Sequence, residues 1–157
     1  MISEKLYRPC VGIALFNSDG KLFVGERIDT PGAWQMPQGG IDEGEEAEHA
    51  FYREMKEEIG TDKATILDVM DRPVRYDFPD KLKKSLWNGK YSGQEQTWIA
   101  GRFTGCDTDI DINAFDPAEF SQWKWEKPEL LLDLIVPFKK SLYIEVLKYF
   151  SGYNNSH

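Results

Sequence analysis

A glycine-rich turn followed by a glutamate-rich helix, between Gly39 and Thr61, constrains the fold more than any other stretch of the chain. The segment reads GGIDEGEEAEHAFYREMKEEIGT. Two glycines open it, and the pattern that follows predicts a helix from about Glu45 to Ile59. Gly60 comes next, where a helix C-terminus favours a residue that can adopt a positive φ.

The predicted helix carries acidic residues on its apolar side. At about 100° per residue, the core-facing side is marked by Ala47, Ala50, Phe51 and Met55. Glu54 and Glu58 fall within that stripe, and Glu57 lies beside it. A solvated acidic face is one interpretation. However, carboxylates on a buried side repel one another and lose hydration, at a cost of several kcal/mol each. Because Mg²⁺ or Mn²⁺ would compensate that cost, the pattern favours a metal site.

The segment resembles the Nudix box, which is a Gly, five residues, a Glu, seven residues, and then Arg-Glu-apolar-x-Glu-Glu-x-Gly-apolar. The fixed positions are occupied here by Gly39, Glu45, Arg53, Glu54, Met55, Glu57, Glu58 and Gly60. Thr61 departs from the final apolar position, which packs rather than reacts. The resemblance implies the α/β fold of that family, a Nudix-type α/β/α sandwich with a central mixed β-sheet and the box helix packed on it.

The resemblance also implies a metal site holding one to three Mg²⁺ or Mn²⁺ ions. Glu57 and Glu58 are expected to be ligands, and Glu54 to be a ligand or the general base. Which glutamate is the base stays open. The backbone of Gly39 can approach a ligand closely, so its carbonyl is a candidate oxygen ligand, although a plain tight turn needs the same residue.

Arg53 is expected to belong to the catalytic group, with Glu54 and Glu57. By the resemblance, it orients a catalytic glutamate and pairs with Glu45. The alternative for Glu45 is a surface ion pair worth under about 1 kcal/mol. Gly40, Glu45 and Gly60 are expected to be structural parts of the box.

The rest of the chain alternates strand and helix signals within one predicted domain, residues 1–157. Strands are expected at 11–16, 22–24, 34–36, 64–70, 73–78, 94–103 and 120–125, the first two forming a hairpin. Helices are expected at 128–135 and 137–150. Residues 37–40 read as a turn, 79–93 as a polar, basic loop, and 151–157 as a frayed tail.

Outside the box, the chain resembles one subgroup, the bacterial RNA 5′-pyrophosphohydrolases and the plant and bacterial dinucleoside polyphosphate hydrolases. The shared stretches are YRPCVGIALFN, RIDTPGAWQMPQGGIDEGE, YDFP, GQEQTW, EFSQWKW and VPFKKSLY. This resemblance implies a further metal ligand, Glu119. It also implies base recognition by Tyr76, Phe138, Lys139 and Arg27, since aromatic stacking is worth about 1–3 kcal/mol per base. Phe138 and Tyr76 have an alternative interpretation as packed residues.

One departure from the subgroup concerns charge. Glu95 and Thr97 of GQEQTW stand where many relatives carry lysines, which predicts less positive charge near the phosphate path. Other basic residues are candidate phosphate contacts or solvated surface lysines and arginines. These are Arg72, Arg75, Lys81, Lys83, Lys84, Lys90, Lys139 and Lys140.

Composition limits the partners. A net charge of −8 argues against bulk attraction to nucleic acid but does not exclude a nucleotide or an RNA 5′ end as substrate. No apolar run approaches the roughly 18 residues of a membrane span, and the N-terminus lacks the apolar core of a signal peptide. Cys10 and Cys106 lack metal-type spacing. We therefore expect a cytoplasmic protein without a membrane or a stable protein partner.

These observations predict a metal-dependent pyrophosphohydrolase that removes pyrophosphate from 5′-triphosphorylated RNA. Hydrolysis of diadenosine tetraphosphate is the alternative from the same subgroup. A non-catalytic nucleotide-binding module is a third hypothesis, and it predicts a broken box, whereas Glu54, Glu57 and Glu58 are all present. An acidic calcium-binding protein fits poorly because the glutamates lie on a helix rather than in a calcium loop.

Overall fold

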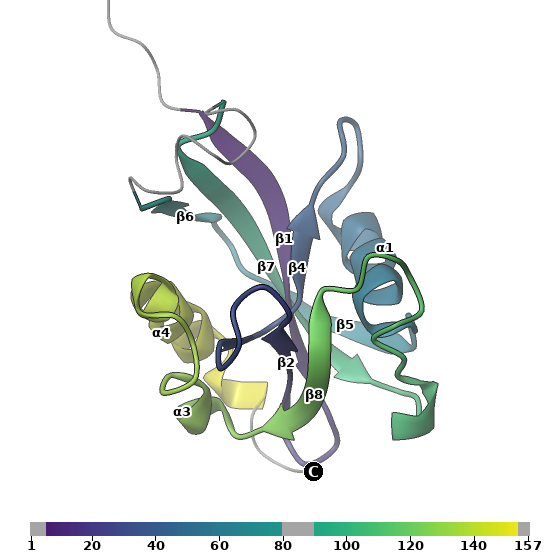
Figure 1. The fold of residues 1–157 in the computed structure, drawn as a ribbon. Helices are drawn as coiled ribbons and strands as arrows, with labels where there is room; N and C mark the ends of the chain where they lie inside the picture. Colours follow the sequence, from purple (N-terminus) through teal and green to yellow (C-terminus); the bar gives the residue numbers. More distant parts are fainter. Residues whose placement is uncertain (1–5, 80–89, 154–157) are drawn as a thin grey trace, which may run out of the picture.

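The structure, a computed structural model, describes residues 6–79 and 90–153 of the chain (Figure 1). Some residues to which the sequence analysis gave a role lie outside these ranges. They are Lys81, Lys83, Lys84, most of the loop at 79–93 and the tail at 154–157.

Within the described residues, eight strands pair into one sheet. The strands are β1 (Tyr7–Phe16), β2 (Leu22–Arg27), β3 (Trp34–Gln35), β4 (Gln38–Gly40), β5 (Ala64–Val69), β6 (Val74–Asp77), β7 (Gly93–Phe103) and β8 (Phe120–Glu126). β1 and β7 are parallel, from Tyr7 opposite Gly93 to Phe16 opposite Arg102. The other pairings in the sheet are antiparallel. The predicted mixed sheet is therefore confirmed.

β1 lies at the centre of this sheet and changes partners along its length. The main strand order is β3-β2-β1-β7-β5, with β8 on β2 and β6 on β7. On the side away from β7, Cys10 to Gly12 of β1 pair with β4, whereas Phe16 pairs with Leu22 of β2. The sheet thus divides between β4 and β2.

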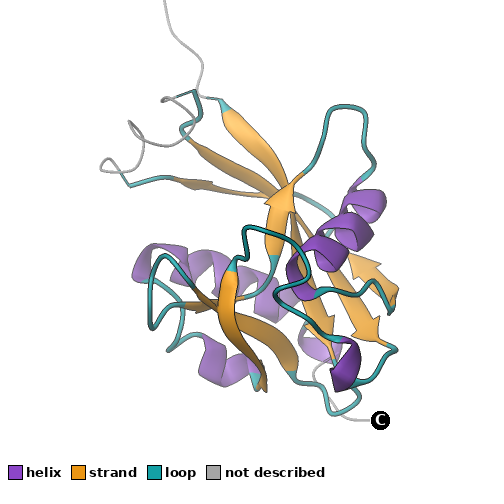
Figure 2. Cartoon of the chain, turned by 45° about the vertical axis from the view of Figure 1, so that its right-hand side comes forward, coloured by secondary structure: helices purple, strands orange, loops and turns teal. Residues whose placement is uncertain are grey.

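Helices cover both faces of the sheet (Figures 1 and 2). The core on one face joins α1 (Ala47–Ile59) to one set of β1 side chains, which includes Ile13. The core on the other face joins α3 (Pro128–Leu131) and α4 (Lys140–Tyr149) to the alternate set, which includes Phe16. This alternation is the period-2 pattern of a strand buried on both sides. It confirms the α/β/α sandwich.

The glutamate-rich helix agrees closely with its prediction. α1 begins at Ala47 rather than Glu45, because Glu46 has an extended backbone with φ −74° and ψ 147°. Glu54 and Glu58 are only 8% and 9% exposed, beside Ala50, Phe51 and Met55, which are fully buried. Acidic and apolar residues therefore do share the buried side.

The C-terminus of α1 depends on glycine. Gly60 has a φ of 80°, and a Cβ atom there would lie 2.5 Å from the carbonyl oxygen of Asp111. We expect Gly60→Ala to lower the free energy of unfolding by at least about 2 kcal/mol, because it adds backbone strain and a close contact. Urea unfolding would measure this. Gly152→Ala is the control, since a Cβ atom at Gly152 has open space. Equal stability of the two variants would contradict the prediction.

Three predictions of local structure were wrong. Residues 38–40, predicted as part of a turn, form β4 on the edge of β1, because glycines allow both a turn and a close edge pairing. The helix predicted from residue 137 begins as a 3₁₀ turn, η3 (Pro137–Lys139), before α4. The helix predicted at 128–135 ends at Leu131.

The tail was also predicted wrongly in part. Ser151–Tyr153 form a 3₁₀ turn, η4, and the Tyr153 ring lies 6.3 Å from the Phe16 ring. One more 3₁₀ turn, η2 (Asp107–Asp109), lies in the acidic connector after β7. No helix in the described ranges is long and apolar enough to cross a membrane.

Candidate active site

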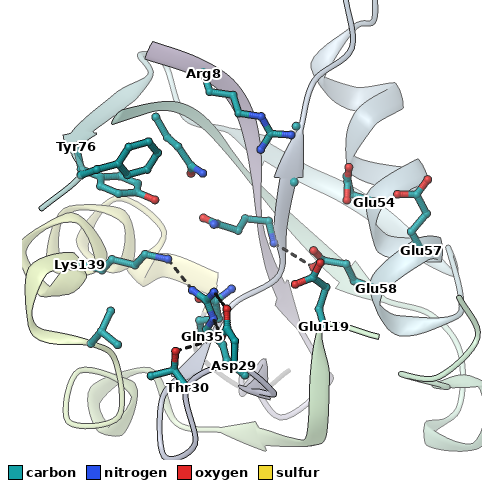
Figure 3. A pocket seen from close by; sticks show the side chains of 17 residues that line it. Arg8, Asp29, Thr30, Gln35, Glu54, Glu57, Glu58, Tyr76, Glu119 and Lys139 are labelled. Carbon is teal, nitrogen blue, oxygen red and sulfur yellow. Dashed lines mark hydrogen bonds and ion pairs between the residues drawn. The ribbon is translucent and has the colours of Figure 1, made fainter. Parts of the chain in front are cut away.

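A pocket of about 620 Å³ opens where the sheet divides (Figure 3). Its lining has an acidic side and a basic, aromatic side. The acidic side comprises Glu54, Glu57, Glu58, Glu119 and the backbone of Gly39 and Gly40. The basic, aromatic side comprises Arg8, Arg27, Tyr76 and Lys139, with the amides of Gln35, Gln38 and Gln94. The pocket thus brings together most of the predicted site residues.

The acidic side concentrates negative charge in a buried place. Burial raises the pKa of Glu58 well above its usual range, and the charges of Glu54 and Glu119 add to this effect. Burial also raises the pKa of Glu54. Glu57 is more open, with 43% of its side chain exposed. Four carboxylates around one recess create an excess of negative charge that favours binding of a cation.

The donor set fits a hard divalent cation. All of these side chains offer carboxylate oxygens, and the Glu54 carboxylate lies so close to Gly39 that a Cβ atom there would be 2.0 Å from it. In the present side-chain positions, no three His, Cys, Asp or Glu side chains of residues 6–79 and 90–153 form a ready ligand cluster. Two of these carboxylates are held by Arg53, because its Nη1 donates to Glu54 and Glu57, at 2.9 and 3.3 Å.

Arg53 also ties the helix to the glycine-rich strand. Its Nε and Nη2 donate to the two carboxylate oxygens of Glu45, each at 2.8 Å, and Nη2 donates to the carbonyl of Gly40 at 2.8 Å. Hydrogen bonds from Arg53 lower the pKa of Glu45 far below its usual range. A two-pronged pairing of this kind fixes orientation as well as adding energy. Arg53 therefore holds the Glu54 carboxylate and the Gly40 backbone in one geometry.

The basic side contains a buried lysine. Lys139 is 4% exposed, and its Nζ lies 5.7 Å from the Tyr76 ring centre. Burial lowers the pKa of Lys139 to about 8. Its Nζ donates to Gln35 Oε1 at 3.3 Å, and the same oxygen accepts from Arg27 Nη1 at 3.5 Å. Gln35 thus joins two cations at the pocket wall, where an anion or a base edge rich in acceptors would fit.

Several pocket residues were missed by the sequence analysis, for lack of a distinctive pattern. Arg27 donates from Nε to Asp29 at 2.8 Å, and this aspartate lies in the shared stretch RIDTPGAWQMPQGGIDEGE but was given no role of its own. The glutamines are neutral, so neither charge nor periodicity marks them. Phe138 lies in η3, but its side chain is not among those that the structure describes.

The predicted effect of Glu95 and Thr97 on the phosphate path stays a prediction, and neither residue lines the pocket. Both alternate along β7 with Gln94, which lines the pocket, so they point to the opposite face of the strand. Glu95 is paired there with Arg75 at 2.7 Å. Glu95 and Thr97 therefore share the face of β7 that carries Ile99, which packs in the core with α1.

Comparison with known proteins identifies the family. The NUDIX domain matches residues 6–146. The chain belongs to the Nudix family. It is 49% identical to the RNA pyrophosphohydrolase of Wolbachia pipientis (strain wPip) over 97% of this chain and 94% of that protein. It is 53% identical to the RNA pyrophosphohydrolase of Erythrobacter litoralis over 92% of this chain and 90% of that protein. Dependence on divalent metal is general among Nudix hydrolases.

Solved structures confirm the Nudix fold. The dihydroneopterin triphosphate pyrophosphohydrolase of E. coli aligns with a TM-score of 0.70 and 23% identity over 90% of this chain and 97% of that chain. A C. elegans Ap4A hydrolase aligns with a TM-score of 0.63 and 18% identity over 92% of this chain and 99% of that chain. At such identities the likeness concerns the fold alone.

The close contact at Gly39 can be tested. We expect Gly39→Ala to lower kcat/KM at least about 100-fold, because the new methyl group displaces the Glu54 carboxylate from its place. Stability should change little, since the displaced group is the end of a flexible side chain. Steady-state kinetics and thermal unfolding would measure the two effects. Gly152→Ala should behave as wild type in both, and near-normal activity of Gly39→Ala would contradict the role of this contact.

Proposed function

We propose that this Nudix protein hydrolyses 5′-triphosphorylated RNA, releasing pyrophosphate and leaving a 5′-monophosphate. One observation carries the proposal: a single pocket joins a buried carboxylate cluster to a basic, aromatic wall. The first suits phosphoanhydride hydrolysis, and the second suits a nucleotide base and phosphates. The names of relatives that are about half identical over most of the chain support the same substrate. A cytoplasmic location and a single domain over residues 1–157 accompany this proposal.

We assign the metal site to Glu54, Glu57, Glu58, Glu119 and the carbonyl of Gly39. This set would hold one to three Mg²⁺ or Mn²⁺ ions, since those ions prefer oxygen donors. When bound, such ions supply positive charge that offsets the phosphate oxygens and lowers the pKa of water. The carboxylates are supplied mainly by consecutive turns of α1, which fixes their spacing.

The protein's own groups bind and orient the substrate. Tyr76 offers a ring for a base, while Lys139 and Arg27 offer positive charge beside it; Phe138 is proposed as the second stacking residue. Arg53 orients Glu54, which is a candidate for the general base because its buried carboxylate keeps a high proton affinity. Glu57 is the other candidate. Gly40, Glu45 and Gly60 hold the box in shape.

A comparison of two substrates tests the function. We expect kcat/KM with Mg²⁺ to be much higher for a short 5′-triphosphate RNA, with pyrophosphate as product, than for diadenosine tetraphosphate. A large preference for the dinucleotide, with ATP and AMP as products, would make the protein a dinucleoside polyphosphate hydrolase instead. If the protein hydrolyses neither compound, both substrate assignments are refuted. With tight nucleotide binding, that last outcome would support a non-catalytic module.

A further inference from the structure

A chain of side-chain amides runs from the core to the pocket wall. The buried Trp98 donates from Nε1 to Gln96 Oε1 at 2.9 Å. Gln96, which is 1% exposed, donates from Nε2 to Gln94 Oε1 at 2.8 Å and to Gln38 Oε1 at 2.5 Å. Gln94 and Gln38 both line the pocket, on β7 and β4 respectively. The chain thus links a fixed core residue to two strands of the site.

Trp98 sets the direction of donation along this row of hydrogen bonds. An indole N–H can only donate, whereas a glutamine amide can turn to donate or accept. Trp98 therefore turns the oxygen of Gln96 inward and its NH₂ group outward. The indole itself cannot reorient, because its ring lies flat against Gly12, where a Cβ atom would be 2.4 Å away. Its edge-to-face contact with Tyr143, at 5.8 Å, fixes it from another side.

The donor-to-acceptor direction set by Trp98 also orients the amides of Gln94 and Gln38 at the pocket wall. Because Gln94 and Gln38 accept from Gln96 through their oxygens, their own NH₂ groups are free to point elsewhere. Burial raises the pKa of Tyr76, and a hydrogen bond with Gln38 lowers it, which is the effect of an amide that donates to the phenol oxygen. Gln94 lies between Arg8 and Tyr76 in the strand register. Arginine, amide and phenol thus form a wall of hydrogen-bond donors.

We propose that Trp98 and Gln96 are positioning residues that turn the Gln94 NH₂ group toward the pocket, where it donates to a phosphate oxygen of the substrate. The inference rests on the proposed function only in naming a phosphate chain as the ligand. A wall of donors favours groups that only accept, and phosphate oxygens are such groups. Gln94 adds this selectivity without adding charge.

A substitution that reverses the direction of hydrogen bonding along the amides is the decisive test. In Gln96→Glu, a carboxylate can still accept from Trp98 but cannot donate, so Gln94 and Gln38 must turn their NH₂ groups inward and their oxygens into the pocket. We expect the affinity for inorganic pyrophosphate, measured by calorimetry in Mg²⁺ buffer, to fall at least about 30-fold. Thr97→Glu adds the same charge on the opposite face of β7 and should change the affinity less than about threefold.

A neutral variant separates direction from charge. Trp98→Phe removes the N–H and keeps an aromatic ring, so pyrophosphate affinity should fall about fivefold, the effect of one hydrogen bond. Trp125→Phe is the matched control, because its Nε1 donates to Asp107 away from the pocket. In NMR spectra, the Gln94 side-chain amide signals should shift on adding pyrophosphate to wild type. Both variants must first show a native fold in the same spectra.

The outcomes separate this inference from the proposed function. If Gln96→Glu and Thr97→Glu bind pyrophosphate equally well, or if the Gln94 amide signals do not respond, the inference is refuted. If wild type binds pyrophosphate as described but does not hydrolyse 5′-triphosphate RNA, the proposed function fails and the inference stands.

Discussion

Glu57→Gln should abolish turnover while the fold stays intact. Glu57 lines the acidic side of the pocket, and its carboxylate is 43% exposed. Loss of its charge should remove a proposed metal ligand, with a fall in kcat on the order of 10³-fold, equivalent to about 4 kcal/mol. The exposed amide needs no new buried partner, so the thermal midpoint should stay close to wild type. Kinetics in Mg²⁺ and calorimetric unfolding measure the two quantities.

Glu48→Gln is the matched control for this variant. Glu48 lies on the exposed side of the same helix and is absent from the pocket lining. The substitution removes the same charge from α1 and should leave kcat within about twofold. Retained activity in Glu57→Gln would remove Glu57 from the metal site. Loss of activity in Glu48→Gln as well would show that helix charge alone, rather than ligation, is responsible.

Lys139→Met should make the protein more stable and less active. Burial lowers the pKa of Lys139 to about 8 from 10.5, so the charged form costs about 3 kcal/mol in the folded state at pH 7. Loss of the hydrogen bond to Gln35 offsets about 1 kcal/mol of this gain. We expect a net gain of roughly 2 kcal/mol in the free energy of unfolding. Denaturant unfolding at pH 7 measures it.

The pH dependence of this gain follows from linkage. Because the folded pKa lies below the unfolded value, the unfolded state binds more protons between pH 8 and 10.5, and wild-type stability rises with pH there. The gain from Lys139→Met should therefore be complete below pH 8 and disappear toward pH 10.5. Charged or titratable groups that also act on Lys139 are Arg27, Asp29, Cys10 and Glu58.

Lys139→Met should lower the activity although it raises the stability. Loss of a charge-assisted contact to substrate predicts a decrease of about 10- to 100-fold in kcat/KM at pH 7. Wild-type kcat/KM should also decline above pH 8 as Lys139 loses its proton, and the variant should lack this decline. A variant that is less stable than wild type, or equally active, would contradict the assignment of Lys139 as a destabilising functional residue.

Much of the fold could be predicted because the relevant signals are local. The α1 stripe places Glu54 and Glu58 beside Phe51 and Met55 by helical geometry alone, and the structure confirms their burial. Gly60 follows from the backbone requirement of a helix end. Strands such as β7 and β8 are marked by alternation of apolar and polar residues, and their predicted ends lie within one residue of the observed ones.

What could not be predicted depends on register between distant strands. Whether Glu95 or Gln94 faces the pocket is decided by the pairing of β7 with β1 and β6, which sequence alternation does not specify. Those pairings, together with the pairing of β4 with β1, bring Gln38, Gln94 and Gln96 into one row of hydrogen-bonded amides. β4 was missed because its glycines carry no side-chain pattern. Its pairing with β1 is visible only in three dimensions.

The parallel pairing of β1 with β7 also has a consequence for synthesis of the protein. During synthesis, β1 (Tyr7–Phe16) is made long before β7 (Gly93–Phe103), which pairs with it on one side. Contacts between strands so far apart in the sequence form slowly. The face on which α1 buries its glutamates is therefore incomplete while the first half of the chain leaves the ribosome. Glu119 is made later still. A nascent chain that already carries the whole Nudix box thus lacks part of the pocket lining, including Glu119 and Lys139, until its last third has been synthesised.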